Sequence, residues 1–334
     1  MRYSTLGCIV TLILGLLMAP FLGMAQAAGK VRRIGILRTG VTSPESARNL
    51  EAFRHGLRHL GWVEGQNLVI EDRAAEGQVE RLPALVAELL QRQVEVLVTA
   101  GGINATHAAK AATRTMPIVM VTTADPVREG LVASLARPGG NVTGVAGLHT
   151  EIMERRLALL KEAVPQVSRI AVLLNSTYNP SIQAQRLQEV HATAQALGLE
   201  VSVQEVRSPG ELEGAFTAMT QAGAGALLVF NDPLVLEPHR RDIVALALHH
   251  RLPAIYPWRM YVDAGGLMVY GISLRERFRR AASHVDKLLK GANPADLPVE
   301  QPMQFELVIN LKTATAIGLT IPPTVLFQAD EVIK

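Results

Sequence analysis

Short apolar runs alternate with helical patterns along the first part of the chain. The runs are rich in β-branched residues and lack a strict polar alternation, which is typical of parallel strands covered on both faces by crossover helices. The pattern therefore predicts an α/β fold built on a parallel sheet. The first three predicted strand–helix pairs are 33–37 with 47–60, 94–100 with 105–113, and 118–122 with 131–136.

The same rhythm restarts after a turn-rich segment at 137–141, so we predict two doubly wound parallel-sheet lobes. The division that we expect is 28–146 plus 272–302 for lobe 1 and 147–271 plus 303–334 for lobe 2. A final strand and helix follow a Pro-rich extended stretch at 293–302. The other elements predicted in this half are strands 142–145, 169–174, 200–206, 226–230 and 267–270, and helices 151–163, 180–197, 210–222, 238–250 and 274–290.

The first 27 residues are predicted to be a signal peptide. Arg2 precedes an apolar run at 6–24, and Ala25-Gln26-Ala27 then forms a small–x–small cleavage pattern. The alternatives are a retained membrane anchor and lipoprotein attachment at Cys8. Cleavage would remove Cys8, the single cysteine, so the mature chain would have neither a disulfide nor a thiol nucleophile.

Charge and motifs exclude several classes of protein. The formal net charge is only +3, and the densest basic group, Arg275 to Arg280, alternates with Glu276 and Phe278 on a predicted helix. We interpret this group as a solvated helix face, so we predict no nucleic-acid partner. The chain has no nucleophile elbow, no phosphate-binding loop and no zinc-type His-Glu-x-x-His sequence. We therefore predict no enzyme activity, no cofactor and no metal.

Ligands of doubly wound sheets bind beyond the carboxyl ends of the strands, where helix N-termini offer unpaired N–H groups. This rule selects five polar, turn-rich loops as candidate ligand contacts. They are residues 38–43, 101–104, 123–126, 175–179 and 231–233.

Three stretches of sequence resemble the ABC-transporter substrate-binding proteins that are related to tryptophan- and phenylalanine-binding receptors. The resemblance implies a type I periplasmic-binding fold, with two lobes joined by three crossing strands and a small-molecule ligand between them. It also implies that the lobes close on the ligand without covalent chemistry, and that a membrane permease recognises the closed state. The stretches are ATRTMPIVMVTTADPVREGLVASLARPGGNVTGV (112–145), RLPAIYPWRMYVDAGGLMVYG (251–271) and KGANPADLPVEQPMQFELVINLKTATAIGLTIPP (290–323).

The resemblance also assigns roles to the loops. Thr39 and Ser43 would offer hydroxyl groups, and Asp125 would offer a carboxylate to an amine. Asn175 and Asp232 would close from the other lobe. The alternatives are local: an aspartate before a proline favours turns, and Asn or Asp before a helix is commonly an N-cap.

One loop departs from the family pattern, because Gly101-Gly102-Ile103-Asn104 stands where many relatives have a Thr-Pro pair. Gly102 removes the side-chain obstruction to backbone N–H groups, so an anionic ligand group could approach it and Asn104. Tyr256 and Tyr270, with Trp258 between them, are expected to wall the cleft, although rings at strand ends also occur as core edges.

The sequence thus predicts a monomeric, periplasmic solute-binding component of an ABC importer. Its partners would be a small molecule, either amino-acid-like or a small carboxylate or aromatic compound, and the membrane permease. The alternatives are a periplasmic sensory module for a membrane kinase or chemoreceptor, and an enzyme on a related α/β scaffold.

Overall fold

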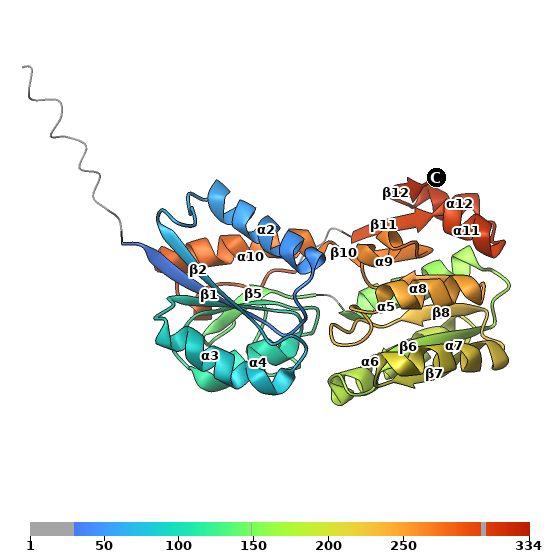
Figure 1. Cartoon of the computed structure of the whole chain (residues 1–334), viewed down its shortest axis with the longest axis horizontal. Helices are drawn as coiled ribbons and strands as arrows, with labels where there is room; N and C mark the ends of the chain where they lie inside the picture. The colour runs from blue at the N-terminus through green and yellow to red at the C-terminus, as the bar shows by residue number, and fades with distance from the viewer. Residues whose placement is uncertain (1–29, 148, 302–304) are drawn as a thin grey trace, which may run out of the picture.

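The computed structural model describes residues 30–147, 149–301 and 305–334, which form two lobes side by side (Figure 1). Each lobe is a sheet covered by helices on both faces, as the alternating pattern predicts. The predicted signal peptide lies outside the described residues. No helix in the described ranges is long and apolar enough to span a membrane.

The first lobe contains a fully parallel sheet with the strand order β2-β1-β3-β4-β5. Helices α3 and α4 cover one face, and α2 and α10 cover the other. The strands are β1 (Arg32–Arg38), β2 (Leu68–Ala74), β3 (Val96–Ala100), β4 (Ile118–Val121) and β5 (Val142–Val145). The helices are α2 (Pro44–His59), η1 (Val79–Arg81), α3 (Leu82–Gln91), α4 (Ile103–Ala112), α10 (Leu274–Leu289) and η3 (Pro294–Asp296).

The second lobe contains a sheet with the order β12-β11-β10-β9-β8-β6-β7, parallel except where β11 runs antiparallel to β10. Helices α5, α6, α11 and α12 cover one face, and α7, α8 and α9 cover the other. The strands are β6 (Arg169–Asn175), β7 (Glu200–Val206), β8 (Ala226–Val229), β9 (Ala254–Tyr256), β10 (Met268–Ile272), β11 (Phe305–Asn310) and β12 (Glu331–Ile333). The helices are α5 (His149–Ala163), α6 (Pro180–Ala196), η2 (Pro209–Glu211), α7 (Leu212–Gln221), α8 (Arg240–His249), α9 (Arg259–Asp263), α11 (Leu311–Ile317) and α12 (Pro323–Phe327).

The chain changes lobe at three places. It leaves the first sheet after β5 and enters α5, and it returns from β10 to α10. Glu300 still pairs with Val145 at the edge of the first sheet, whereas β11, which begins at Phe305, belongs to the second. Each lobe is therefore assembled from segments that are distant in the sequence.

Capping hydrogen bonds and small residues fix helix α2 in the first lobe. Ser43 caps the helix by accepting a hydrogen bond from the Ser46 N–H, while the Ser46 hydroxyl accepts one from the Ser43 N–H. These two bonds satisfy N–H groups that the first turn leaves unpaired. Further along, a Cβ on Gly56 would lie 2.8 Å from the Cβ of Ala282, so small residues allow α2 and α10 to pack closely.

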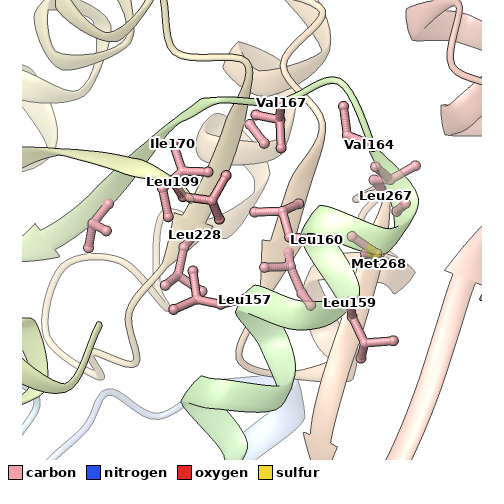
Figure 2. Packing of buried hydrophobic residues seen from close by; sticks show 14 of the residues in the cluster. Leu157, Leu159, Leu160, Val164, Val167, Ile170, Leu199, Leu228, Leu267 and Met268 are labelled. Carbon is pink, nitrogen blue, oxygen red and sulfur yellow. The ribbon is translucent and has the colours of Figure 1, made fainter. Parts of the chain in front are cut away.

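The second lobe has a large apolar core between α5 and the sheet (Figure 2). Leu157 and Leu160 of α5 pack with Ile170 and Leu228 of the neighbouring strands, and all four are fully buried. Leu157 and Leu160 are three residues apart, so they lie on the same face of α5. The burial of α5 anchors the segment by which the chain enters this lobe.

One predicted helix is absent and several elements were missed. Residues 131–136 form turns instead of a helix: the N–H groups of Leu131 and Val132 both donate to the Pro126 carbonyl, and the Lys110 ammonium donates to the carbonyl of Leu131. Leu131 and Val132 are buried, so their apolar character reflects core packing by an irregular segment. The elements that the sequence pattern did not predict are β2, α3, β9, α9, α12 and β12.

Replacing Leu160 with alanine tests the second core. We expect Leu160→Ala to lower the free energy of unfolding by about 2–5 kcal/mol, because it removes buried methyl groups and leaves a cavity. Urea denaturation measures this loss. Leu60→Ala is the matched control, since Leu60 is 38% exposed and Leu160 is fully buried. Equal losses from the two substitutions would contradict this packing.

Candidate ligand-binding cleft

A cavity of about 210 Å³ lies between the lobes. The first lobe contributes the start of α2, the ends of β3 and β4, and the start of α10, and the second contributes the loop after β8 and Trp258. All of these are strand ends, loops after strands or helix starts, including Trp258, which lies between β9 and α9, as expected for this type of sheet. The polar side chains in the lining are Arg38, Ser43, Ser46, Asn49, Thr122, Thr123, Asn231, Glu237, Arg240 and Arg277.

The two lobes contact each other around this cavity. The Asn231 side-chain amide donates to the Thr123 hydroxyl over 3.3 Å, and Arg128 forms an ion pair with Glu189 at 3.3 Å. The Arg277 guanidinium of the first lobe lies 5.9 Å from the ring centre of Trp258 in the second. The two lobes therefore contact each other through polar groups and through Arg277 and Trp258.

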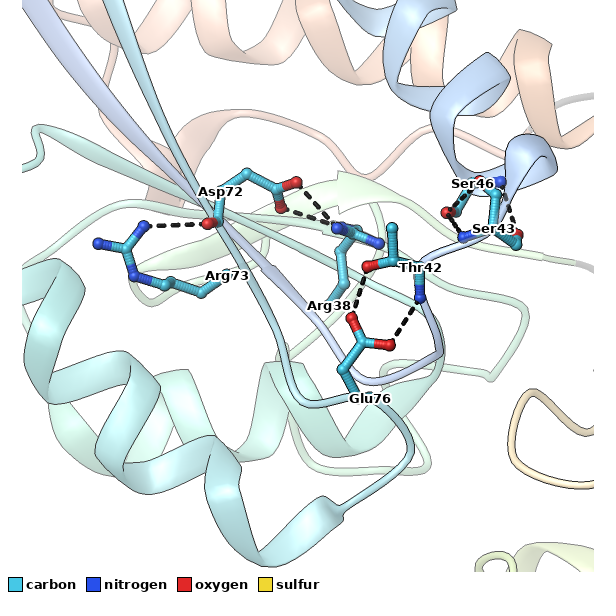
Figure 3. A network of polar contacts seen from close by, with 7 residues as sticks. All are labelled: Arg38, Thr42, Ser43, Ser46, Asp72, Arg73 and Glu76. Carbon is cyan, nitrogen blue, oxygen red and sulfur yellow. Dashed lines mark hydrogen bonds and ion pairs between the residues drawn. The ribbon is translucent and has the colours of Figure 1, made fainter.

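Polar contacts fix the loop after β1, which forms one wall of the cavity (Figure 3). Arg38 Nε and Nη2 donate to the two oxygens of Asp72 over 2.9 and 2.8 Å, so this cavity arginine already has a carboxylate partner. The backbone N–H and hydroxyl of Thr42 both donate to Glu76. This loop therefore presents the N-terminus of α2 to the cavity from a fixed position.

Of the predicted contacts on this side, the structure places Ser43 and Gly102 in the lining. Thr39 is fully buried next to the cavity, and its hydroxyl has no hydrogen-bond partner in the described part of the chain. Asn104 is half-buried in the first turn of α4 and is not part of the lining.

The predicted acidic and amide contacts have local partners. Asp125 is exposed, and its carboxylate accepts the N–H groups of Val127 and Arg128, which is the turn-forming alternative. Asp232 is fully buried and accepts three backbone N–H groups of residues 234–236, together with the amide of Asn175. The structure thus brings Asn175 and Asp232 together, at a distance of 3.2 Å, but beside the cavity and not in its lining.

The two tyrosines pack inside the second lobe. Tyr256 stacks on Tyr261 at 4.9 Å, and Tyr270 stacks on Phe305 at 5.6 Å. Neither residue is part of the cavity lining, whereas Trp258 is. The Trp258 indole N–H donates to Asn231 over 2.9 Å, so this ring is held at the cavity wall.

The interpretation of the basic group on α10 is wrong for one of its members. Arg277 is only 1% exposed and lines the cavity, whereas Arg279 and Arg280 bond to Glu276 on the outside of the helix. Helical periodicity could have revealed this, because Arg277 lies four residues before Ala281 and eight before Val285, both fully buried. Thr123 and Asn231 of the lining lie in two of the loops that the sequence selects, whereas the sequence pattern gave no sign of Asn49, Thr122 and Glu237.

Glu237 places a carboxyl group in the lining from the second lobe. Its pKa is raised to about 7, mainly by burial and also by the nearby Asp232, while Arg240 opposes the shift. In the described ranges, no three His, Cys, Asp or Glu side chains are grouped so that they could hold a metal ion. The polar groups in the lining are suited to hydrogen bonding and ion pairing with a small molecule.

Comparison with known proteins gives a consistent result. The family model described as ABC transporter substrate binding protein matches residues 34–333. A tyrosine-binding protein of Clostridioides difficile is 27% identical over 292 residues, which cover 87% of this chain and 82% of that protein.

Two solved structures are similar over most of the chain. The L-Trp complex of a domain from Streptococcus pneumoniae has a TM-score of 0.81 and 28% identity, and the match covers 90% of this chain and 99% of that one. A conserved domain protein of Vibrio cholerae has a TM-score of 0.83 and 25% identity, with 91% and 100% covered. The periplasmic binding protein type I-like fold that the resemblance implies is thereby confirmed.

The raised pKa of Glu237 predicts a pH dependence of stability. The folded chain retains a proton up to about pH 7, whereas the unfolded chain releases it near the ordinary value of 4.5. This group's stabilising contribution is therefore complete below the unfolded value and is lost as the pH rises through the folded value. Relative to Glu237→Gln, the wild type should lose stability between about pH 4.5 and about pH 7 in thermal melts.

The control for this experiment is Glu213→Gln, which changes an exposed glutamate on α7 of the same lobe. Parallel stability curves for the wild type and Glu237→Gln across this range would contradict the burial of Glu237.

Gly102 offers a test of closure. Its φ is +113°, and a Cβ there would collide with the Tyr178 hydroxyl of the other lobe. We expect Gly102→Ala to keep the lobes apart, which small-angle X-ray scattering would detect as a larger radius of gyration. The double variant Gly102→Ala/Tyr178→Phe has the same backbone strain without the hydroxyl and should regain the compact form. Equal radii for the single and double variants would exclude this collision as the cause.

Proposed function

The chain belongs to the ABC transporter substrate binding protein family, and on this basis we propose that it is the periplasmic solute-binding component of an ABC importer. In this role it would be exported by the signal peptide expected at residues 1–27 and would act as a monomer. A membrane permease would receive the solute from it.

The observation that carries the proposal is the cavity between the lobes. Its walls come from both lobes, so a molecule inside it touches both at once. A ligand shifts a conformational equilibrium only by its difference in affinity between the two states. A solute that contacts Trp258 and Asn231 on one side and α2 and α10 on the other would have this difference, because an open cleft would separate those groups.

Hinge closure is the proposed mechanism. The chain passes between the lobes at three places, which can bend while each sheet stays intact. Closure would bury the solute and form the surface that the permease recognises. The contacts between Asn231 and Thr123 and between Arg128 and Glu189 would then belong to the closed state of the lobes.

The first solutes to test are the aromatic amino acids, because two of the similar proteins are a tyrosine-binding protein and a domain solved in complex with L-Trp. Small carboxylates and other aromatic compounds follow. Trp258 and Phe278 give the cavity aromatic walls on which a planar group could stack.

A melting screen of the purified protein tests this function. Amino acids, aromatic acids, small carboxylates and nucleosides are each added in turn, and a solute at about 100 times its dissociation constant should stabilise the protein by about 2.7 kcal/mol. We expect at least one of them to raise the melting temperature. Trp258→Ala should abolish that increase, because this ring forms part of the cavity wall.

Trp62→Ala is the matched control, since Trp62 lies away from the cavity and donates to Asp286 on α10. A melting temperature that no solute class raises would contradict the proposed function. An increase that survives in Trp258→Ala would place the solute elsewhere.

A further inference from the structure

Arg277 lines the cavity, and one edge of its guanidinium group is unpaired. Its Nη1 donates to the carbonyl of Thr122 over 2.9 Å. Its Nε and Nη2 are buried and have no hydrogen-bond partner among the residues that the structure describes. A buried donor without a partner is costly, so these two N–H groups indicate a missing acceptor.

Other arginines of this chain show what the same edge binds. Arg38 uses Nε and Nη2 to hold both oxygens of Asp72, and Arg279 uses the same pair for Glu276. This side-by-side pair of N–H groups matches the two oxygens of a carboxylate. The buried Arg156 differs, because its Nε and Nη2 donate separately to the carbonyls of Tyr270 and Pro257.

The charge of Arg277 is also uncompensated. Burial alone lowers its pKa to about 10, which leaves the group protonated at neutral pH. The side chain forms no ion pair with any residue in the described ranges. A buried charge without a counter-ion is strongly unfavourable, and an anionic ligand would remove that cost.

The surroundings of Arg277 favour an anion with an apolar body. Ser43, Ser46 and Asn49 bring the N-terminus of the 16-residue helix α2 to the same cavity, and its dipole favours negative charge. Phe278 and Trp258 provide apolar walls beside the guanidinium. The cavity therefore combines a positive, hydrogen-bonding region with an aromatic one.

We propose that the solute carries a carboxylate group, and that Arg277 binds it through Nε and Nη2 as a bidentate pair. This inference rests on the proposed function, since it assigns the chemistry of the solute in the same cavity. Trp258 of the other lobe lies over the guanidinium, so closure shields the ion pair from water. The pair is thereby stronger in the closed state than in the open one.

The experiment compares acids with amides in which a neutral carboxamide replaces the carboxylate. Matched probes are L-tryptophan and L-tryptophanamide, L-tyrosine and L-tyrosinamide, indole-3-acetate and indole-3-acetamide, and benzoate and benzamide. Melting shifts identify the pairs that bind, and calorimetry gives their dissociation constants. In the wild type, we expect an acid to bind about 10- to 100-fold more tightly than its amide, as charged hydrogen bonds require.

Variants assign this preference to Arg277. Arg277→Gln should remove it, and Arg277→Lys should keep only part, because lysine retains the charge without the paired N–H groups. Arg280→Gln is the matched control, since Arg280 is on the same helix and bonds to Glu276. Without any solute, Arg277→Met should melt no lower than the wild type, because it removes an uncompensated buried charge.

The results separate the two proposals. An amide that binds as tightly as its acid, or an acid preference that survives in Arg277→Gln, overturns the carboxylate inference and leaves solute binding in the cleft intact. If no probe and no solute of the wider screen raises the melting temperature, the proposed function itself fails. Loss of the acid preference in Arg277→Gln but not in Arg280→Gln supports the inference.

Discussion

The packing of α10 against α2 is the contact on which the cleft depends. Gly56 and Ala282 allow the two helices to approach closely, and Phe278, Val285 and Leu289 of α10 share one core with the first sheet. Helix α10 follows β10 of the second lobe directly, so this packing fastens a late segment of the chain onto the first lobe. This packing also places Arg277 at the cleft, one helical turn after the chain passes from the second lobe to the first.

Several polar groups at the cleft are left unpaired by the protein itself. Within the described ranges, the Arg277 Nε and Nη2, the Thr39 hydroxyl and the Asn49 side-chain oxygen have no partner. In contrast, Asp232 and Arg38 near the same cavity are fully engaged with neighbouring residues. Polar groups with hydrogen-bond partners thus surround a smaller set of polar groups without partners. This arrangement is expected where a ligand supplies the missing partners.

Much of the fold could be predicted from the sequence, because parallel strands and amphipathic helices have strong local patterns. The strand at 200–206 was predicted with the same bounds as β7. Residues 131–136 were mistaken for a helix. They form turns that bury Leu131 and Val132, and the spacing of apolar residues cannot distinguish such turns from a short helix. Strand β2 was missed because the segment from Leu68 to Ala74 carries charged residues at the edge of the sheet.

The site was harder to predict, because lining residues are selected by three-dimensional position. Ser43 and Gly102 follow from the rule that ligands bind beyond strand ends, and both line the cavity. Asp125 follows a strand and carries a carboxylate, as a ligand contact would, yet this carboxylate accepts backbone N–H groups of a turn on the surface. Arg277 was overlooked because its neighbours in the sequence are exposed charged residues. It differs from them only in lying on the buried face of α10.

The distance between the lobes tests most directly whether solute binding closes the cleft. Nitroxide labels can be attached at Ala111→Cys on α4 and Ala192→Cys on α6, both exposed, in a chain whose single native cysteine is removed by Cys8→Ser. Electron-electron double resonance then measures the distance between the labels with and without the solute that the melting screen identifies. Closure on the solute should give a shorter, narrower distance distribution when the solute is bound. Identical distributions with and without a bound solute would contradict it.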